Sequence, residues 1–226
     1  MSAPATLAAQ LAAEDLEALA WLHEEERLPA SLTELFSSDF CSTLSILPAH
    51  HPACQAMADA LQALAAQPAP RPQACADDLA ADYAAIYLTY AFRAAPYESV
   101  WRDEEHLMMQ GPTFAVRGFY ERHGFHVSNW RHMPDDHLTH QLRFIASLLR
   151  QGKEREAARF IRSHLMVWLP LFAERVVQRA QTRFYAALAQ LTLDCVTACQ
   201  NWLPVVAVIP TVQTATPADT CSASPC

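Results

Sequence analysis

The chain has 226 residues, which is enough to bury a sizeable hydrophobic core without disulfides or structural metals. Apolar residues make up 52% of it and glycine occurs only 4 times, a balance that favours packed helices over a sheet with many tight turns. The formal net charge of -8 argues against the basic surface that nucleic-acid binding requires, so nucleic acid is not expected as a partner.

Apolar positions at helical spacing predict that most of the first half is helical. They recur over residues 6–26 and over residues 76–92, where the second set includes several tyrosines. Between these stretches, Ser31-Leu32-Thr33-Glu34 has the spacing of a capping box and predicts a short second helix, and a third helix is expected to end near Ala66. Three prolines within residues 67–72 predict a stiff loop.

Prolines and glycines divide the second half into shorter segments. Pro96 predicts an irregular stretch over residues 93–101, and Asp103-Glu104-Glu105 predicts the start of a helix. Gly111-Pro112 interrupts that helix and begins another, which ends near Gly124. After a loop, helices are expected over residues 136–151, with Asp135 or Asp136 as the cap, and over residues 154–166, 170–180 and 183–202.

These elements predict an all-α fold with a single bundle-like domain of about nine to eleven helices over residues 1–203. Residues 204–226 lack periodicity and are predicted to be a disordered C-terminal tail. The N-terminus has no secretory signal pattern, and the longest apolar run, Leu165 to Ala173, is about half of a membrane span. We therefore expect a cytoplasmic protein that does not insert into membranes.

The 7 cysteines are scattered along the chain, and their spacing fits neither a disulfide framework nor a paired zinc site. Cys195 and Cys199 lie one helical turn apart and are expected to pack in the core as small apolar residues. Reduced thiols agree with a cytoplasmic location.

Three segments differ from this helical background. They are Asp82-Tyr83, the loop Pro96-Tyr97-Glu98-Ser99-Val100-Trp101 and the junction Met133-Pro134-Asp135-Asp136-His137. Taken in order with Met109-Gln110-Gly111-Pro112-Thr113 and Val116-Arg117-Gly118-Phe119-Tyr120, they resemble the TorD/DmsD/NarJ family of redox-enzyme maturation chaperones, in particular its TorD-like branch. The resemblance is close over residues 79–150. The family pattern has Glu where this chain has Met133, so one acidic group of the expected cluster is absent.

The resemblance implies an all-helical chaperone without catalytic activity. Such a protein binds an apo-molybdoenzyme through its twin-arginine signal peptide in the cytoplasm and assists cofactor insertion before Tat export. No cofactor of its own is implied, apart from transient contact with the molybdopterin cofactor or, as for some members, a guanine nucleotide. No Gly-rich phosphate loop supports a nucleotide site. A monomer or a domain-swapped dimer is expected.

A twin-arginine signal peptide carries two guanidinium groups before an apolar stretch, so its binder needs carboxylates beside a hydrophobic groove. If the two loops converge, they supply both, and the predicted signal-peptide-binding residues are Tyr97, Glu98, Ser99, Trp101, Asp135, Asp136 and His137. Asp135 is expected to be the helix cap, which leaves Asp136 and His137 as the stronger contacts, unless His137 ties the two loops together. The groove should provide affinity and the carboxylates selectivity.

Three alternatives remain at this point. The first is a metal-dependent helical phosphohydrolase that uses five histidines within residues 123–140, although these lack an i, i+4 pair of ligands and the acid precedes the histidine in Asp136-His137. The second is nucleophilic catalysis by Ser99 or a cysteine with His137, for which no Gly-x-Ser-x-Gly elbow is present. The third is a helical interaction module without an export role, against which only the ordered motifs argue.

Overall fold

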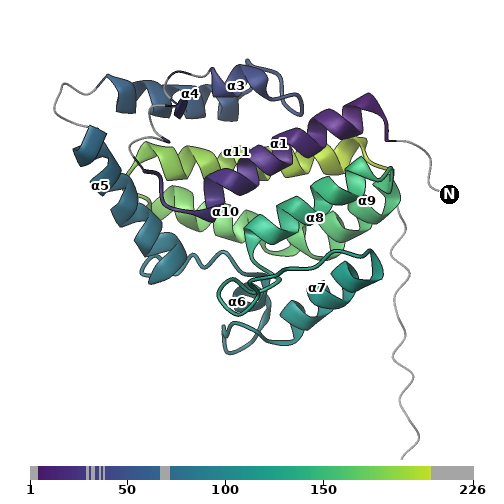
Figure 1. Ribbon diagram of the computed structural model, residues 1–226. Helices are drawn as coiled ribbons and strands as arrows, with labels where there is room; N and C mark the ends of the chain where they lie inside the picture. The colour runs from purple at the N-terminus through teal and green to yellow at the C-terminus, as the bar shows by residue number, and fades with distance from the viewer. Residues whose placement is uncertain are drawn as a thin grey trace, which may run out of the picture.

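The computed structural model describes residues 5–28, 31, 34–35, 37, 39–66 and 72–204 (Figure 1). Over these residues the protein is all-helical, with ten α-helices and no strand, which confirms the predicted fold class. The capping box of residues 31–34, the proline-rich loop and the predicted tail lie wholly or largely outside the described residues. The domain boundary after residue 203 therefore stays a prediction.

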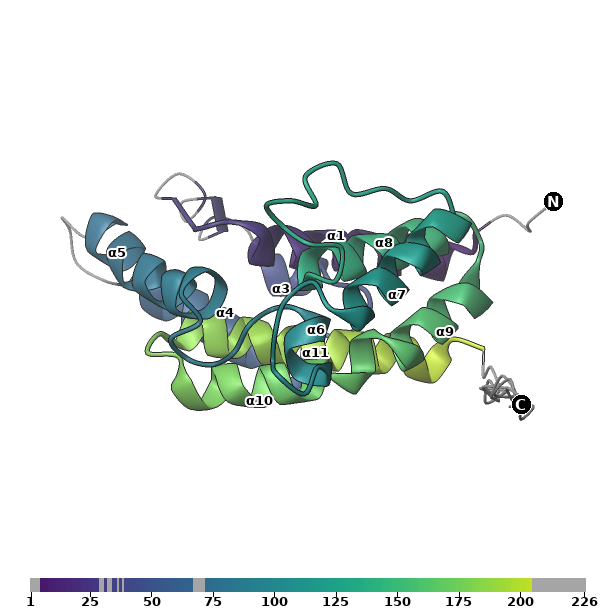
Figure 2. The ribbon, with the colours of Figure 1, turned by 90° about the horizontal axis from the view of Figure 1, so that it is seen from below.

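The helices are arranged in two main layers, which Figure 2 shows from below. In one layer, α1 (Leu7–Glu24) packs along α8 (Leu138–Arg150) in the most extensive helix pair of the described part. In the other layer, α11 (Arg183–Trp202) packs on α10 (Leu169–Arg179) and α4 (Pro52–Ala65). The α1 and α11 helices also contact each other, so the two layers share one core.

Shorter elements surround these layers. They are α3 (Phe40–Thr43), α5 (Pro72–Tyr83), a π-helical turn at Ala84–Leu88, α6 (Glu98–Arg102), α7 (Gly111–Arg122), α9 (Glu154–Ser163) and a 3-10 turn at Leu165–Val167. In Figure 1, α6 and α7 lie together beside α8, and α5 lies at the other end of the molecule. The segments between α5 and α8 therefore form one side of the fold, and this side carries the predicted site.

Local sequence signals account for most helix boundaries. The Thr6 side chain accepts a hydrogen bond from the backbone N–H of Ala9 and caps α1, because it satisfies one of the N–H groups left free in the first turn. Prolines in the first turns of α4, α7 and α10 begin those helices, since that position needs no backbone N–H. The prediction for residues 183–202 matches α11 at both ends.

Two helix predictions were wrong in the middle of the chain. The helix expected over residues 76–92 begins at Pro72, loosens into the π-helical turn and ends at Leu88. The helix expected from Asp103 is absent, because the Asp103 carboxylate accepts hydrogen bonds from the backbone N–H groups of Glu105 (3.1 Å) and Leu107 (3.2 Å) and so stabilises a loop instead. Both errors lie in the segments that surround the pocket described below.

Two buried aspartates connect helices to distant loops. The Asp15 carboxylate on α1 accepts hydrogen bonds from the backbone N–H groups of Ser45 and Ile46, each at 2.7 Å. The Asp82 carboxylate on α5 accepts the backbone N–H groups of Gln181 (3.0 Å) and Thr182 (2.7 Å), in the turn between α10 and α11. These bonds satisfy loop amides that would otherwise be buried unpaired. The first of the three unusual sequence segments therefore has a structural role.

The four cysteines with described side chains are buried and unpaired, namely Cys41, Cys54, Cys195 and Cys199. Burial raises the pKa of the Cys199 thiol to about 12, so this thiol stays protonated and unreactive at neutral pH. This confirms the expected core positions of Cys195 and Cys199. No helix in the described ranges has the length and hydropathy needed to cross a membrane.

Burial favours the neutral form of three histidines, His23, His137 and His140. Burial lowers the pKa of His23 to about 3, and it also lowers the pKa values of His137 and His140. His23 lies between Tyr87, which hydrogen bonds to Nδ1, and Thr192, whose Oγ1 is 2.9 Å from Nε2. The Thr192 hydroxyl donates its own proton to the Leu188 carbonyl at 2.8 Å, so it accepts the proton on His23 Nε2. Because Nε2 of His23 carries the proton, Nδ1 accepts the hydrogen bond from Tyr87, and a second proton on Nδ1 would break that bond.

We expect the protein to lose stability as the pH falls below about 6.5. Histidines in the unfolded chain bind protons there, whereas burial opposes protonation of His23, His137 and His140, so protons favour the unfolded state. Burial raises the pKa of Asp15 and Asp136, which acts in the opposite sense, and comparing a single variant with the wild type cancels that contribution.

The variant for this comparison is His137→Asn, because an asparagine can still accept the α8 capping bond. Its free energy of unfolding should rise relative to the wild type by about 1.4 kcal/mol per pH unit below pH ~6, since one buried neutral histidine is removed. Urea unfolding at several pH values between 7 and 5 measures this difference. Parallel pH dependences of the two proteins would contradict the prediction. His126→Asn, at an exposed histidine, is the control.

Candidate functional site

The two loops that carry the predicted site meet in the structure. Tyr97 and His137 form an isolated antiparallel bridge. The backbone N–H of Glu98 donates to the Asp136 carbonyl at 3.2 Å, and the N–H of Leu138 donates to the Pro96 carbonyl at 2.9 Å. The segment before α6 and the segment before α8 are therefore joined by their main chains, although about 40 residues separate them in sequence.

Glu98 is the first residue of α6 and is 0% exposed. Its carboxylate accepts hydrogen bonds from Arg102 Nη1 at 2.6 Å and from Gln141 Nε2 at 2.8 Å, and it lies 3.1 Å from His164 Nδ1. Partners from α6, α8 and the residue after α9 thus surround both carboxylate oxygens. The Glu98 carboxylate is therefore buried among internal partners, as a charge in the interior requires, and its contact with a signal peptide stays a prediction.

Asp136 is also 0% exposed, and it acts as a cap for a helix other than its own. Its Oδ2 accepts the backbone N–H of Ser99 at 2.8 Å, in the first turn of α6. Its Oδ1 is also buried, and the buried hydroxyls of Ser99 and Thr113 lie close to the carboxylate. Burial raises the pKa of Asp136, because the charged form has lost its hydration.

The other two junction residues are buried as well. The Asp135 carboxylate pairs with Arg117, with Nε at 3.0 Å and Nη2 at 2.7 Å, and its carbonyl accepts the Tyr120 hydroxyl. The His137 side chain caps α8 by accepting the backbone N–H of Thr139 at 3.1 Å, so the expectation that Asp135 or Asp136 would cap this helix was wrong. His137 also packs edge-on against Tyr97, at 4.9 Å between ring centroids, and ties the two loops together.

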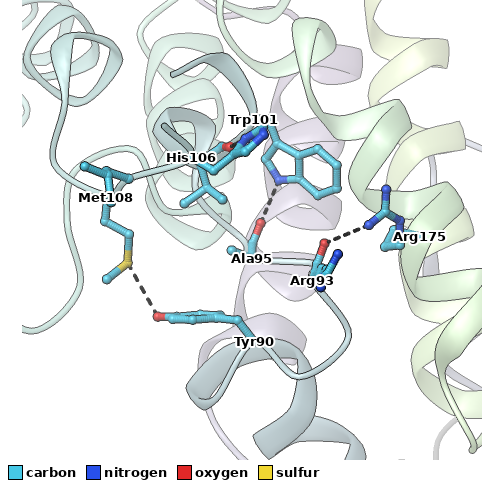
Figure 3. A pocket seen from close by; sticks show the side chains of 9 residues that line it. Tyr90, Arg93, Ala95, Trp101, His106, Met108 and Arg175 are labelled. Carbon is cyan, nitrogen blue, oxygen red and sulfur yellow. Dashed lines mark hydrogen bonds between the residues drawn. The ribbon is translucent and has the colours of Figure 1, made fainter. Parts of the chain in front are cut away.

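A pocket of about 670 Å³ opens beside this junction (Figure 3). Its lining residues come from the loop after the π-helical turn, from α6 and the loop that follows, and from α10. They are Tyr90, Arg93, Ala95, Val100, Trp101, His106, Leu107, Met108 and Arg175. Of the seven predicted residues, Trp101 lines the pocket, and its indole N–H donates to the Ala95 carbonyl at 2.8 Å. A largely apolar concave surface of this size is suited to an apolar ligand segment.

Sequence reasoning missed most of the pocket. Leu107 and Met108 are 48% and 40% exposed, and two apolar residues between an acidic stretch and Gly111 were a signal that could have been used. Arg175 contributes from α10, more than 70 residues further along the chain, and no local pattern connects it with Trp101. Its guanidinium lies 5.8 Å from the Trp101 ring centroid.

Backbone strain is concentrated at the rims of this pocket. Within the described ranges, the non-glycine residues with positive φ are Tyr90 (54°), Arg93 (52°), His106 (57°) and Met109 (58°). Tyr90, Arg93 and His106 line the pocket, and Met109 directly follows the lining residue Met108. The Tyr90 hydroxyl lies 3.5 Å from the Met108 sulfur and bridges the rims, as Figure 3 shows. Such conformations are costly and are found where a site holds its backbone in place.

The His-rich segment does not form a metal centre in the described part of the chain. No group of three or more His, Cys, Asp or Glu side chains there is placed to hold a metal ion. His137 accepts a backbone N–H, and His140 Nε2 lies 3.2 Å from the Met133 carbonyl. These contacts show structural uses for two of the five histidines that the phosphohydrolase alternative requires.

Comparison with known proteins adds independent information. The sequence profile of a family described as "Nitrate reductase delta subunit" matches residues 48–174. This range contains both loops of the junction and every lining residue of the pocket except Arg175.

Similar proteins of known name include chaperones. The chain is 31% identical over 102 residues to "Tat proofreading chaperone DmsD" of Salmonella typhi, with 45% of this chain and 50% of that protein covered. It is 34% identical over 128 residues to "Chaperone protein TorD" of Vibrio cholerae, with 51% and 58% covered, and 28% identical over 164 residues to TorD of Vibrio vulnificus, with 67% and 74% covered. The alignments with the first two span about half the length of those relatives.

Proposed function

This chain belongs to the nitrate reductase delta subunit family, which includes TorD and DmsD chaperones, and we propose that it is a cytoplasmic chaperone for a molybdenum-containing redox enzyme. In this proposal it binds the twin-arginine signal peptide of the apoenzyme and assists insertion of the molybdopterin cofactor before Tat export. It acts by binding and not by catalysis. The observation that carries the proposal is the apolar pocket around Trp101, formed largely by the segment that the family profile matches.

The pocket suits the apolar stretch of such a peptide. Trp101, Val100, Leu107 and Met108 present apolar surface at its opening and walls. Burying about 400 Å² of apolar peptide surface would contribute roughly 10 kcal/mol before the cost of ordering the peptide, whereas an exposed ion pair contributes about 0.2 to 1 kcal/mol. Affinity should therefore come from the pocket.

The seven predicted residues divide into two roles under this proposal. Trp101 contacts the peptide directly. The other six, Tyr97, Glu98, Ser99, Asp135, Asp136 and His137, hold α6 and its following loop against α8 and so maintain the pocket wall. Their direct contact with a signal peptide stays a prediction, and the burial of their polar groups favours the supporting role.

We expect Trp101→Ala to weaken binding of a twin-arginine signal peptide by about 30-fold or more, since truncating a central aromatic anchor typically costs 2 kcal/mol or more. Met108→Glu should weaken binding as well, because it places a charge in the apolar opening. Calorimetric titration with a synthetic peptide measures both effects. Leu7→Glu is the matched control for the charge that Met108→Glu adds. Leu7 is exposed at the start of α1, and its neighbour Thr6 contacts Glu154 at the start of α9.

Unchanged affinity in both pocket variants, with the wild type binding, would move the peptide site elsewhere on the molecule. A wild-type protein that does not bind any twin-arginine peptide would contradict the proposed function itself. Far-UV circular dichroism of each variant verifies that it is folded.

A further inference from the structure

We propose that the signal peptide lies in one direction across the pocket, with its two arginines beside Glu104 and Glu105, and that its apolar stretch continues past Trp101 onto Leu171 of α10 and Val167 of the preceding 3-10 turn. This inference rests on the proposed function and specifies where the ends of the peptide lie. It follows from two features outside the junction: the charges at the two rims and an exposed apolar surface on α10.

The apolar surface continues beyond the pocket along α10. Arg175 lines the pocket, and Leu171 precedes it by one helical turn, so both side chains lie on the same side of the helix. Leu171 is 49% exposed, and Val167, in the preceding 3-10 turn, is 42% exposed. Two large apolar side chains exposed next to an apolar pocket form a larger binding surface than the pocket alone.

The rim formed by α10 and the loop before α6 is positively charged. Arg93 and Arg175 line the pocket, and Arg179 lies one helical turn after Arg175. The guanidinium groups of Arg175 and Arg179 donate to the backbone carbonyls of Arg93 (3.4 Å) and Phe92 (3.0 Å) rather than to carboxylates, so their charge is not neutralised by these contacts. Arginines of a peptide would be repelled from this rim.

A second segment, the loop after α6, contributes lining residues and carries negative charge. Glu104 and Glu105 are exposed and directly precede His106, Leu107 and Met108, which line the pocket. Within the described residues, neither carboxylate takes part in an ion pair, unlike Glu98, which is paired with Arg102. These two carboxylates are therefore available to a cationic ligand, and they belong to a different segment from Arg93 and Arg175.

Charge and surface together determine the direction. A peptide with adjacent arginines before an apolar stretch fits these surfaces in one direction only. Its arginines lie at the acidic segment, and its apolar stretch runs through the pocket and then along α10. Val167 lies eight residues before Arg175, which corresponds to about 12 Å along a helix, or roughly four residues of an extended peptide. A peptide with a long apolar stretch should reach this surface, and one with a short stretch should not.

The test uses three synthetic peptides as probes. The long peptide has two arginines followed by twelve leucine and alanine residues, the short peptide has only five such residues, and the glutamine peptide is the long peptide with both arginines replaced. We expect Leu171→Glu to weaken binding of the long peptide about tenfold and that of the short peptide less than twofold.

We expect Glu104→Lys combined with Glu105→Lys to weaken binding of both arginine peptides about tenfold and to leave binding of the glutamine peptide unchanged. Leu7→Glu is the control for the negative charge that Leu171→Glu adds.

Three outcomes would overturn this inference without affecting the proposed function. The first is equal affinity of wild type and Leu171→Glu for the long peptide while Trp101→Ala still weakens it. The second is equal sensitivity of the arginine and glutamine peptides to the double lysine variant. The third is a wild-type dimer that Leu171→Glu converts to a monomer in sedimentation experiments, which would identify a second copy of the chain as the occupant of this surface. If the wild type binds none of the three peptides, the proposed function itself is refuted.

Discussion

Replacing Asp136 by alanine is expected to lower the free energy of unfolding by about 2 to 4 kcal/mol. The substitution removes the acceptor for the Ser99 backbone N–H in the first turn of α6 and leaves that donor buried without a partner. It also opens a small cavity next to the buried hydroxyls of Ser99 and Thr113, which lose the nearby carboxylate. Urea unfolding monitored by circular dichroism measures the loss.

Asp136→Asn separates the two contributions of this side chain. An amide oxygen can still accept the Ser99 N–H, while the buried charge is removed, so this variant should lose less than half as much stability as Asp136→Ala. Glu104→Ala is the control at an exposed carboxylate on the same side of the fold and should change stability by less than about 0.5 kcal/mol. An Asp136→Ala protein as stable as the wild type, with weaker peptide binding, would show that Asp136 contacts the ligand directly.

Replacing Glu98 by alanine is expected to cost about 3 kcal/mol, for a related reason. Gln141 and His164 would lose their carboxylate partner in an interior where water does not replace it, and only Arg102, at 40% side-chain exposure, can turn to solvent. Glu98→Gln keeps the shape and part of the hydrogen bonding, so it should lose about half as much.

Peptide binding by the Glu98 variants shows whether Glu98 supports the pocket wall or contacts the signal peptide. If Glu98 holds the pocket wall, the fraction of Glu98→Ala molecules that bind the signal peptide should fall with the folded fraction, while the dissociation constant of the folded molecules stays within about threefold of the wild type. Calorimetry gives both the stoichiometry and the affinity. A full stoichiometry with an affinity lowered tenfold or more would place Glu98 in contact with the peptide instead.

Glu98 and Glu104 differ in a way that the sequence does not show, because the first carboxylate is buried and the second is exposed. The resemblance drew attention to Glu98, Asp135 and Asp136 because these residues stand in recurring motifs. Such motifs also mark residues that the fold requires, and the structure surrounds these three with Arg102, Arg117, Gln141 and backbone N–H groups. Glu104 and Glu105 belong to no motif, and their significance depends on the exposure of their carboxylates next to the pocket.

Boundary errors have a similar cause. Residues 76–92 have helical periodicity throughout, but the π-helical turn at Ala84–Leu88 and the positive φ angles of Tyr90 and Arg93 end the helix early. Asp103 could begin a helix or hold a loop, since its carboxylate can accept backbone N–H groups in both cases. Contacts from distant elements, such as the hydrogen bonds from Arg175 and Arg179 on α10 to the carbonyls of Arg93 and Phe92, lie outside a local sequence window.

The sequence by itself determined the fold class, most of the helices and the family, because helical periodicity, caps, prolines and ordered motifs are local properties that each segment carries alone. It also indicated that the loops before α6 and α8 act together. Only the tertiary structure decided which side chains of those loops face solvent and which residues form the pocket. The physical reason is that burial and charge pairing depend on partners such as Gln141, His164 and Arg175, which lie far away in the chain and come close to this region only through the packing of α8 and α10.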